Sequence, residues 1–154
     1  MICGKIAAGK STLAASLAED DATVLLVLDD WLGALFGDQM QTGADFVRFA
    51  AKLDGVMGPH IVALLKAGIS VVLDFPANTV AQRAQMRELF EAAGAAHALH
   101  VLDVPDEVCL ARLHARNASG THPFAVTQAQ FHRFTQHLVL PSETEGFTLV
   151  RHSA

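Results

Sequence analysis

Hydrophobic and polar positions along the chain form two kinds of segment, short β-branched apolar runs and longer stretches with helical spacing. The short runs predict strands at residues 23–28, 69–73, 98–102 and 147–150. The longer stretches predict helices at residues 10–19, 44–66, 80–93, 106–117 and 127–138. A run such as Val24-Leu25-Leu26-Val27-Leu28 is apolar at every position, which is typical of a strand covered on both faces. The alternation therefore predicts an α/β fold with a parallel sheet between two layers of helices.

Glycine and proline positions predict where several helices begin, end or bend. Gly68 and Gly94 each follow a helical stretch and are expected to end it. Asp106 follows Pro105 and is expected to cap the next helix. Pro59 lies inside the 44–66 stretch, so we expect a kink or break near Gly58.

Composition narrows the class of protein. The chain has 154 residues, 51% of them hydrophobic, and no linker or repeat, which predicts one domain over 1–154. Its formal net charge is −5, and its eleven Lys and Arg residues form no cluster, so a long nucleic acid is an unlikely substrate. Cys3 and Cys109 lie in apolar runs and are expected to be buried and reduced. No membrane-spanning run or export signal is visible, so a cytoplasmic location is expected.

The strongest chemical signal is Gly4-Lys5-Ile6-Ala7-Ala8-Gly9-Lys10-Ser11, which fits the pattern G-x-x-x-x-G-K-[ST] without a departure. In such a loop the backbone amides surround a β-phosphate, and the start of the next helix adds its positive dipole end. We expect these residues and Thr12 to bind ATP, with Lys10 also catalytic and Ser11 a ligand of Mg²⁺. A central strand usually has about five or six residues, but only Met1-Ile2-Cys3 precedes Gly4. Either this strand is unusually short or the numbered chain lacks a few native residues.

An ordered set of further motifs gives the chain a family resemblance. After the loop come Asp29-Asp30-Trp31-Leu32, Val71-Val72-Leu73-Asp74-Phe75, Leu102-Asp103-Val104-Pro105, Arg112-Leu113-His114-Ala115-Arg116-Asn117 and Pro141-Ser142-Glu143. In this order the chain resembles the small P-loop kinases grouped around chloramphenicol phosphotransferase, zeta toxin and polynucleotide kinase, which are often labelled AAA-domain ATPases. The resemblance implies a P-loop three-layer sandwich with about five parallel strands in the order 2-3-1-4-5. It also implies ATP and Mg²⁺ as cofactors and a small-molecule acceptor.

The resemblance assigns roles to three carboxylates. In these kinases an Asp after the second strand accepts the proton of the acceptor hydroxyl, and the family's Asp-x-Trp-Leu form favours Asp29, whereas an Asp-x-Leu form would favour Asp30. An acidic turn that caps a helix over residues 31–36 is the structural alternative. Asp74 ends a strand, as the second Mg²⁺-binding carboxylate does, unless it caps the following helix. The family often continues Asp-Phe-Gly, but here Pro76-Ala77-Asn78 follows Phe75, which leaves the acceptor pocket open.

Two pairs of arginines have the four-residue spacing that places them on one helix face. The resemblance implies that Arg112 lies against the adenine and that Arg116 reaches the phosphates during transfer, with residues 117–127 as a lid. A solvent-exposed helix face is the alternative. Arg83 and Arg87 could bind an anionic part of the acceptor, or equally form an ordinary exposed face.

The histidines and aromatic residues give weaker signals. His97 and His100 lie on or beside one strand, and the others are scattered, so no metal site with histidine ligands is predicted. Trp31, Phe36, Phe46 and Phe49 could line an acceptor pocket, although core packing is the more common role.

The leading hypothesis is therefore a kinase that moves the γ-phosphate of ATP to a small acceptor, with the 44–66 segment on the acceptor side. One alternative is an ATPase or switch that acts through a protein partner, and another is a binding module that retains the loop without transfer. The acceptor and the oligomeric state are left open by the sequence.

Overall fold

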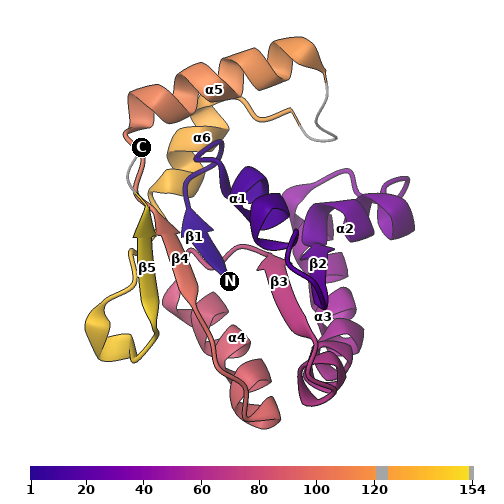
Figure 1. Ribbon diagram of the computed structural model, residues 1–154. Coiled ribbons are helices and arrows are strands. Elements are labelled where there is room, and N and C mark those ends of the chain that lie inside the picture. Colours follow the sequence, from indigo (N-terminus) through magenta and orange to yellow (C-terminus); the bar gives the residue numbers. More distant parts are fainter. Residues whose placement is uncertain (121–124, 153–154) are drawn as a thin grey trace.

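Five parallel strands form the centre of the protein in a computed structural model that describes residues 1–120 and 125–152 (Figure 1). The strands are β1 (Ile2–Gly4), β2 (Thr23–Val27), β3 (Ser70–Asp74), β4 (Leu99–Leu102) and β5 (Leu149–His152). They form two half-sheets, β2-β3 and β1-β4-β5, with every pairing parallel. A backbone bridge between Ile2 and Pro76 places β1 beside β3. The overall order is therefore 2-3-1-4-5, as predicted.

Helices cover both faces of these strands (Figure 1). They are α1 (Lys10–Leu17), α2 (Leu28–Phe36), α3 (Gly43–Lys66), α4 (Val80–Ala93), α5 (Asp106–Ser119) and α6 (Gln128–Thr135), with a short 3₁₀ turn, η1 (Glu143–Glu145). None of the described helices is both long and apolar enough to cross a membrane.

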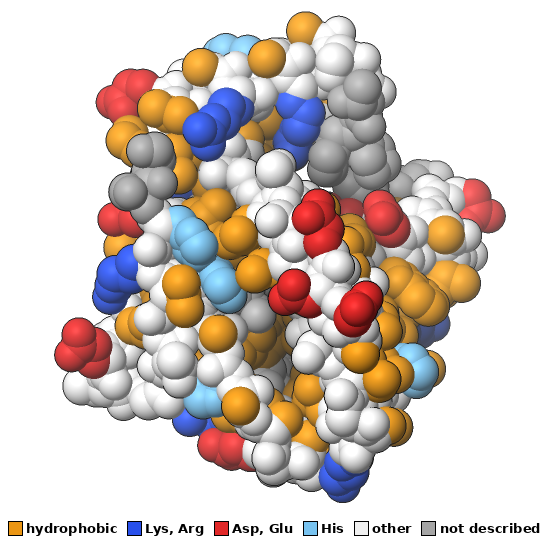
Figure 2. All heavy atoms as spheres, viewed as in Figure 1, with side chains coloured by type: hydrophobic (Ala, Val, Ile, Leu, Met, Phe, Trp, Pro, Cys, Tyr) orange, Lys and Arg blue, Asp and Glu red, His pale blue; other side chains and the backbone are white. Residues whose placement is uncertain are grey.

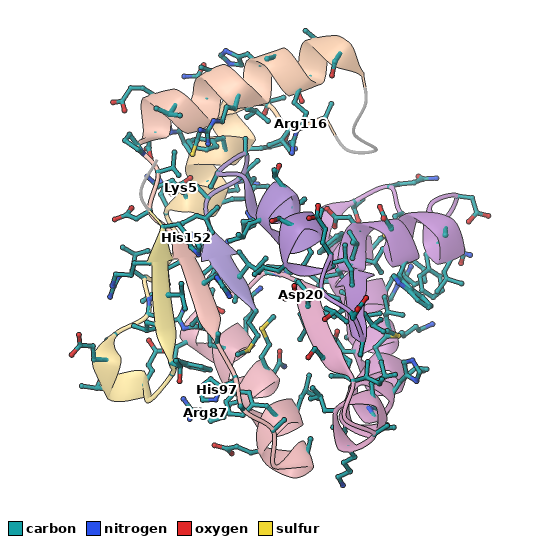
Figure 3. The ribbon with its side chains drawn as sticks, in the orientation of Figure 1. Lys5, Asp20, Arg87, His97, Arg116 and His152 are labelled. Atoms are coloured by element: carbon teal, nitrogen blue, oxygen red, sulfur yellow. The ribbon has the colours of Figure 1, made fainter. Side chains whose placement is uncertain are left out.

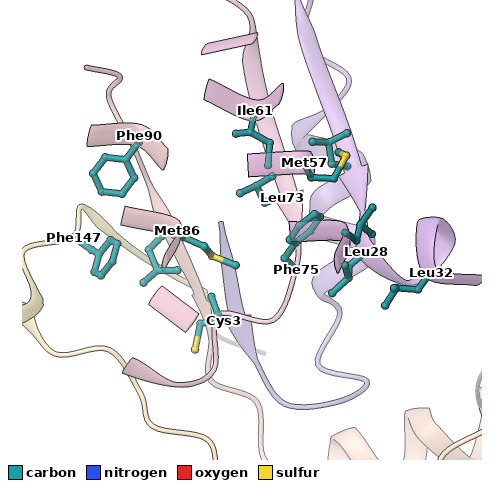
Figure 4. Close-up of a cluster of buried hydrophobic side chains, with 14 of the residues drawn as sticks. Cys3, Leu28, Leu32, Met57, Ile61, Leu73, Phe75, Met86, Phe90 and Phe147 are labelled. Carbon is teal, nitrogen blue, oxygen red and sulfur yellow. The ribbon is translucent and has the colours of Figure 1, made fainter. Parts of the chain in front are cut away.

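Side chains that alternate along the strands divide the core into two clusters. Cys3 and Leu73 point to one face, where they meet the apolar sides of α3 and α4 (Figure 4). Leu26 belongs to the same cluster. The neighbouring Ile2 points to the other face and packs with residues of α1, α5 and α6. Because fully burying one such side chain contributes about 1.5–3 kcal/mol, these two clusters are the main reason the layers hold together. Both cysteines are buried and free, as predicted.

Two predicted helix features differ in the structure. Helix α3 runs through Pro59 without a break, because its capping box of Thr42 and Asp45 and its buried face outweigh one lost hydrogen bond. Gly58 lies against Leu89 of α4, where a Cβ atom would come within 3.5 Å of that side chain. This is an ordinary van der Waals distance, so packing against α4 does not by itself require a glycine at this position.

Asp106 does not cap α5. The N-cap is Pro105, without a side-chain cap, and the Asp106 carboxylate instead accepts a hydrogen bond from the Lys5 ammonium. The predicted stops at Gly68 and Gly94 are confirmed, because both adopt the left-handed conformation, with φ of 81° and 65°.

The boundary between the half-sheets is open beneath β1. A cavity of about 530 Å³ lies there, lined mainly by apolar side chains of α3, β3 and α4. The Met1 amino group lines it and donates to the Ala98 carbonyl at 3.3 Å, and burial lowers the pKa of this amino group to about 6. The two half-sheets therefore meet mainly at the end of β1 that leads into the glycine-rich loop.

Candidate active site

The loop at residues 4–11 has the backbone geometry of an anion cradle. Ala7 and Gly9 both adopt the left-handed conformation, with φ of 60° and 104°. A Cβ atom on Gly4 would lie 2.9 Å from the Leu102 carbonyl oxygen, so only glycine fits there. Gly9 is the N-cap of α1 and supplies no side-chain cap, which leaves the first amides of the helix available to a ligand.

Lys10 lies on the inner side of this loop. Its Nζ donates hydrogen bonds to the carbonyl oxygens of Gly4, at 3.0 Å, and Lys5, at 2.7 Å. Burial lowers the pKa of Lys10, while the charges of Asp74 and Asp29 act in the opposite direction. The ammonium group is therefore held between the loop and the carboxylates of the other half-sheet.

A cavity of about 700 Å³ adjoins the loop. The loop, the first turn of α1, the end of β4, both arginines of α5 and His152 of β5 line it. Lys and Arg side chains lie along the underside of α5 (Figure 2), and Arg116 points down from it toward the rest of the molecule (Figure 3). A volume of this size is typical of small-molecule sites.

Arg112 and Arg116 do share one helix face, as predicted, but their surroundings differ. Arg112 Nη1 donates to the Ala8 carbonyl at 3.2 Å, so it contacts the loop directly. Arg116 Nε is buried and has no hydrogen-bond partner among the described residues. Burial lowers the pKa of Arg116, and the charge of Asp29 raises it. The buried, unpaired Nε of Arg116 is consistent with an anionic ligand in the cavity.

Asp29 and Asp30 both lie in the first turn of α2, which begins at Leu28 rather than at the predicted Trp31. Asp29 is half-buried and acts electrostatically on both Lys10 and Arg116, whereas Asp30 is exposed. The position of Asp29 supports its choice over Asp30. The N-cap of α2 is Val27, which supplies no side-chain cap, so the acidic turn does not take the capping position given by the structural alternative. Both charges do lie near the positive end of the α2 dipole.

Asp74 is the last residue of β3 and is half-buried near Lys10. It does not cap α4, because Thr79 does so with Gln82 in a capping box. Ser11 lies in the first turn of α1 and lines the cavity beside the loop, whereas Asp74 and Asp29 are not among the described residues that line it. Hydroxyl and carboxylate oxygens suit Mg²⁺, which usually retains phosphate and water ligands. Accordingly, the described residues form no group of three or more His, Cys, Asp or Glu side chains that could hold a metal.

The suggestion that Arg83 and Arg87 bind an anionic acceptor is wrong for Arg83, whose side chain is completely buried. Its guanidinium forms a bidentate pair with Glu145, at 2.7 and 2.9 Å. It also donates to the carbonyls of Ala77 and Val139. Arg87 donates to the Glu145 carbonyl and lies 4.3 Å from the Phe147 ring centroid. Both arginines therefore attach the segment before β5 to α4.

The aromatic residues divide between the core and the surface. Phe49 is buried and stacks on Phe36 with ring centroids 4.4 Å apart, and Phe46 packs beside the same core. Trp31 is 42% exposed, which makes it the most exposed of the four.

Three histidines, His97, His100 and His152, make contacts between structural elements. His97 accepts a hydrogen bond from the Thr148 amide and stacks on Phe90 with ring centroids 4.0 Å apart. His100 and His152, on adjacent strands, are joined by a 2.9 Å contact between ring nitrogens.

The predicted lid at residues 117–127 is only partly visible. Helix α5 extends to Ser119, two residues further than predicted, and Asn117 donates to the Val126 carbonyl at 2.8 Å. Residues 121–124 lie outside the described residues.

Sequence reasoning missed two residues beside the loop, Asn78 and His152, and it missed the side-chain contacts of Lys5, which it had placed among the ATP-binding residues. Lys5 donates to the Val104 carbonyl at 2.9 Å and to Asp106, whose hydrogen bond raises the pKa of Lys5. Asn78 accepts a hydrogen bond from the Gly4 amide at 2.9 Å. His152 lines the cavity from β5. Only Asn78 had a signal in the sequence, because it lies in the segment that departs from the family pattern.

Comparison with known proteins places this geometry in a family. A family model described as an AAA domain matches residues 1–141. The chain belongs to the AAA-domain family. The matched part of this AAA-domain protein includes the loop, the acidic residues Asp29, Asp30 and Asp74, and both arginines of α5. Strand β5 lies beyond it. No curated protein matches the chain.

Solved structures show the same fold for this AAA-domain protein. It is similar to a candidate kinase from Chloroflexus aurantiacus, with a TM-score of 0.75 and 20% identity over 99% of this chain and 82% of that one. It is also similar to a sugar kinase from Janibacter, with a TM-score of 0.62 and 16% identity over the same shares of the two chains. At these identities the likeness shows a P-loop kinase fold.

Proposed function

We propose that the protein is an ATP-dependent phosphotransferase that moves the γ-phosphate of ATP to a hydroxyl of a small acceptor. The observation that carries the proposal is the position of Lys10. Its ammonium lies on the carbonyls of the glycine-rich loop and within electrostatic reach of Asp29 and Asp74. Asp29, which follows β2 and acts electrostatically on this lysine, supplies a carboxylate that could accept the proton of an acceptor hydroxyl.

Each residue has a role that follows from its place. The amides of residues 4–11 and the start of α1 bind the polyphosphate, and Lys10 leaves the loop carbonyls to bind the β- and γ-phosphates. Asp29 accepts the proton of the acceptor hydroxyl as its oxygen bonds to the γ-phosphorus and the bond to the β-phosphate oxygen breaks. Arg116 balances the negative charge that accumulates during transfer.

Ser11 and Asp74 are the residues that would hold Mg²⁺. When bound, this ion neutralises charge on the phosphate oxygens. Arg112 fixes the Ala8 carbonyl and closes the cavity on the α5 side, where the base of the nucleotide would lie.

The charges near α2 guide the choice of acceptor. This helix contributes Asp29 and Asp30 and contains no Lys or Arg. Arg83, the buried one of the two candidates for an anionic acceptor, pairs with Glu145. Neutral or cationic hydroxyl compounds, such as sugars, nucleosides and hydroxyl-bearing antibiotics, are therefore the first acceptors to test.

The test is a transfer screen with γ-labelled ATP and Mg²⁺ against these compound classes, run with the wild-type protein and the Asp29→Asn variant. We expect one class to receive label from the wild type and ATP hydrolysis alone to be slow. Hydrolysis that no small molecule accelerates, but that a protein partner does, would instead favour the ATPase or switch alternative. Failure to bind ATP would contradict both the phosphotransferase and the ATPase or switch hypothesis.

A further inference from the structure

The boundary between the two half-sheets, where Ile2 forms its bridge with Pro76, is the seam of the sheet. The Gly4 amide of the loop, close to this seam, has an unusual partner. Gly4 is the last residue of β1, and its N–H donates to the side-chain Oδ1 of Asn78 at 2.9 Å, across 74 positions of sequence. Asn78 lies in the connection between β3 and α4, close to the Ile2–Pro76 bridge. The contact therefore joins the half-sheet that carries the loop to the half-sheet that carries Asp74.

Asn78 is itself held on two other sides. Its N–H donates to the Gln82 side chain at 3.1 Å, and its carbonyl accepts from the Val139 amide at 2.8 Å. The carbonyl of the preceding residue, Ala77, accepts from the fully buried Arg83. With its backbone fixed in this way, the carboxamide has little freedom to leave Gly4.

The contact leads directly to Lys10. The Gly4 N–H is bound by Asn78, and the Gly4 carbonyl accepts from the Lys10 ammonium at 3.0 Å. Three residues separate Asn78 from Asp74, which acts electrostatically on the same ammonium. One residue therefore sets the first glycine of the loop relative to the candidate Mg²⁺ carboxylate.

We propose that Asn78 is a positioning residue for phosphoryl transfer, which holds the glycine-rich loop in register with Asp74 across the seam of the two half-sheets. The role rests on the proposed function. It explains why the chain has Pro76-Ala77-Asn78 after Phe75: the connection supplies a carboxamide to the loop. Sequence motifs of the loop do not include this residue.

The test compares Asn78→Ala with Thr79→Ala. Both variants loosen the start of α4, because Thr79 Oγ1 accepts from the Gln82 amide in the cap of this helix, but only the first removes the acceptor for the Gly4 amide. Binding of a non-hydrolysable ATP analogue with Mg²⁺ is measured by calorimetry, and exchange of the Gly4 amide by NMR. Loss of one hydrogen bond should weaken binding about three- to tenfold in Asn78→Ala. Thr79→Ala should lower the melting temperature and leave the affinity within about twofold of the wild type.

A third variant, Asn78→Asp, separates the contact from general disturbance. It retains an oxygen at the position of Oδ1, so the Gly4 amide should remain protected, whereas in Asn78→Ala it should exchange faster. Equal affinities for wild type and Asn78→Ala, or equal losses in Asn78→Ala and Thr79→Ala, would overturn the role of Asn78 alone. A wild-type protein that does not bind the analogue would instead overturn the proposed function, and this role with it.

Discussion

The two half-sheets contribute to the site in different ways. The β1-β4-β5 half carries the glycine-rich loop, which polar contacts hold: Lys5 to Val104 and Asp106, Lys10 to Gly4, and Arg112 to Ala8. The β2-β3 half carries Asp29 and Asp74, and the helices beside it, α2 and α3, meet through apolar contacts such as Phe36 on Phe49. The proposed nucleotide-binding loop and the two carboxylates proposed for transfer thus lie on opposite sides of the boundary between the half-sheets.

This difference indicates which contacts fix the positions of atoms in the site and which allow them to vary. Hydrogen bonds fix atoms of the loop to within tenths of an ångström, and such directional contacts suit the binding of a constant ligand. Apolar contacts are non-directional and tolerate replacement by groups of similar volume, which suits a side of the site that adapts to different acceptors. Phosphoryl transfer requires both sides to meet correctly, so variants can be ranked by which side, or which connection, they break.

The largest loss of activity should come from removing the Lys10 side chain. Lys10→Ala leaves the loop carbonyls without their cation and the γ-phosphate without a counter-charge, so transfer should fall below detection and ATP binding should weaken. Label transfer and calorimetry measure the two effects. The exposed Lys66→Ala variant of α3 is the control and should behave as the wild type. Turnover near the wild-type rate in Lys10→Ala would show that the loop is not the site.

Variants of Asp29, on the β2-β3 side, should lose transfer activity without losing ATP affinity. Asp29→Asn removes the proton acceptor and retains the shape, so transfer should fall about 10²–10⁴-fold while ATP affinity changes little. Asp30→Asn, one residue further and exposed, is the matched control and should remain close to the wild-type rate. If the larger loss occurred in Asp30→Asn, the assignment of the two carboxylates would be reversed.

The sequence predicted the half-sheets better than the connections between them. Strands, helices and the loop follow from local patterns, so the apolar run at residues 24–28 and the G-x-x-x-x-G-K-[ST] spacing were sufficient. Arg83 was interpreted as either a ligand of an anionic acceptor or part of an exposed face, because its partner, Glu145, lies 62 positions away. Asp106 was predicted to be a cap because the Lys5 side chain that binds it comes from a different element. Asn78 was missed for the same reason, since no local pattern reveals a contact between distant segments.

Removing the buried connection on the α4 side should affect stability more than chemistry. Arg83→Met fills a similar volume but leaves the Glu145 carboxylate and two backbone carbonyls without their donor, which should cost about 3–5 kcal/mol of unfolding free energy. Chemical denaturation measures this loss. The double variant with Glu145→Leu removes the unpaired carboxylate and should recover part of it. An unchanged midpoint in Arg83→Met would show that the pair contributes nothing.

The Arg83–Glu145 pair also predicts that the free energy of unfolding depends on pH in the acidic range. The hydrogen bond from Arg83 holds the pKa of Glu145 below its ordinary value. Its contribution is therefore complete above the ordinary glutamate pKa and is lost as the pH falls through the lower pKa of the folded state. The wild type should lose stability over this acidic range more steeply than Arg83→Met, in denaturation curves measured from neutral pH downward. Parallel curves for the two proteins would contradict this linkage.

The smallest effect should come from the contact of the loop with the start of α5. Asp106 binds the Lys5 ammonium, but its side chain is 41% exposed, so water can replace it in the Asp106→Asn variant. Lys5 would also retain the Val104 carbonyl at 2.9 Å. We therefore expect a loss of stability below about 1 kcal/mol and an ATP affinity within about threefold of the wild type. A larger loss of affinity than in Asn78→Ala would mean that α5, rather than the seam between the half-sheets, sets the position of the loop.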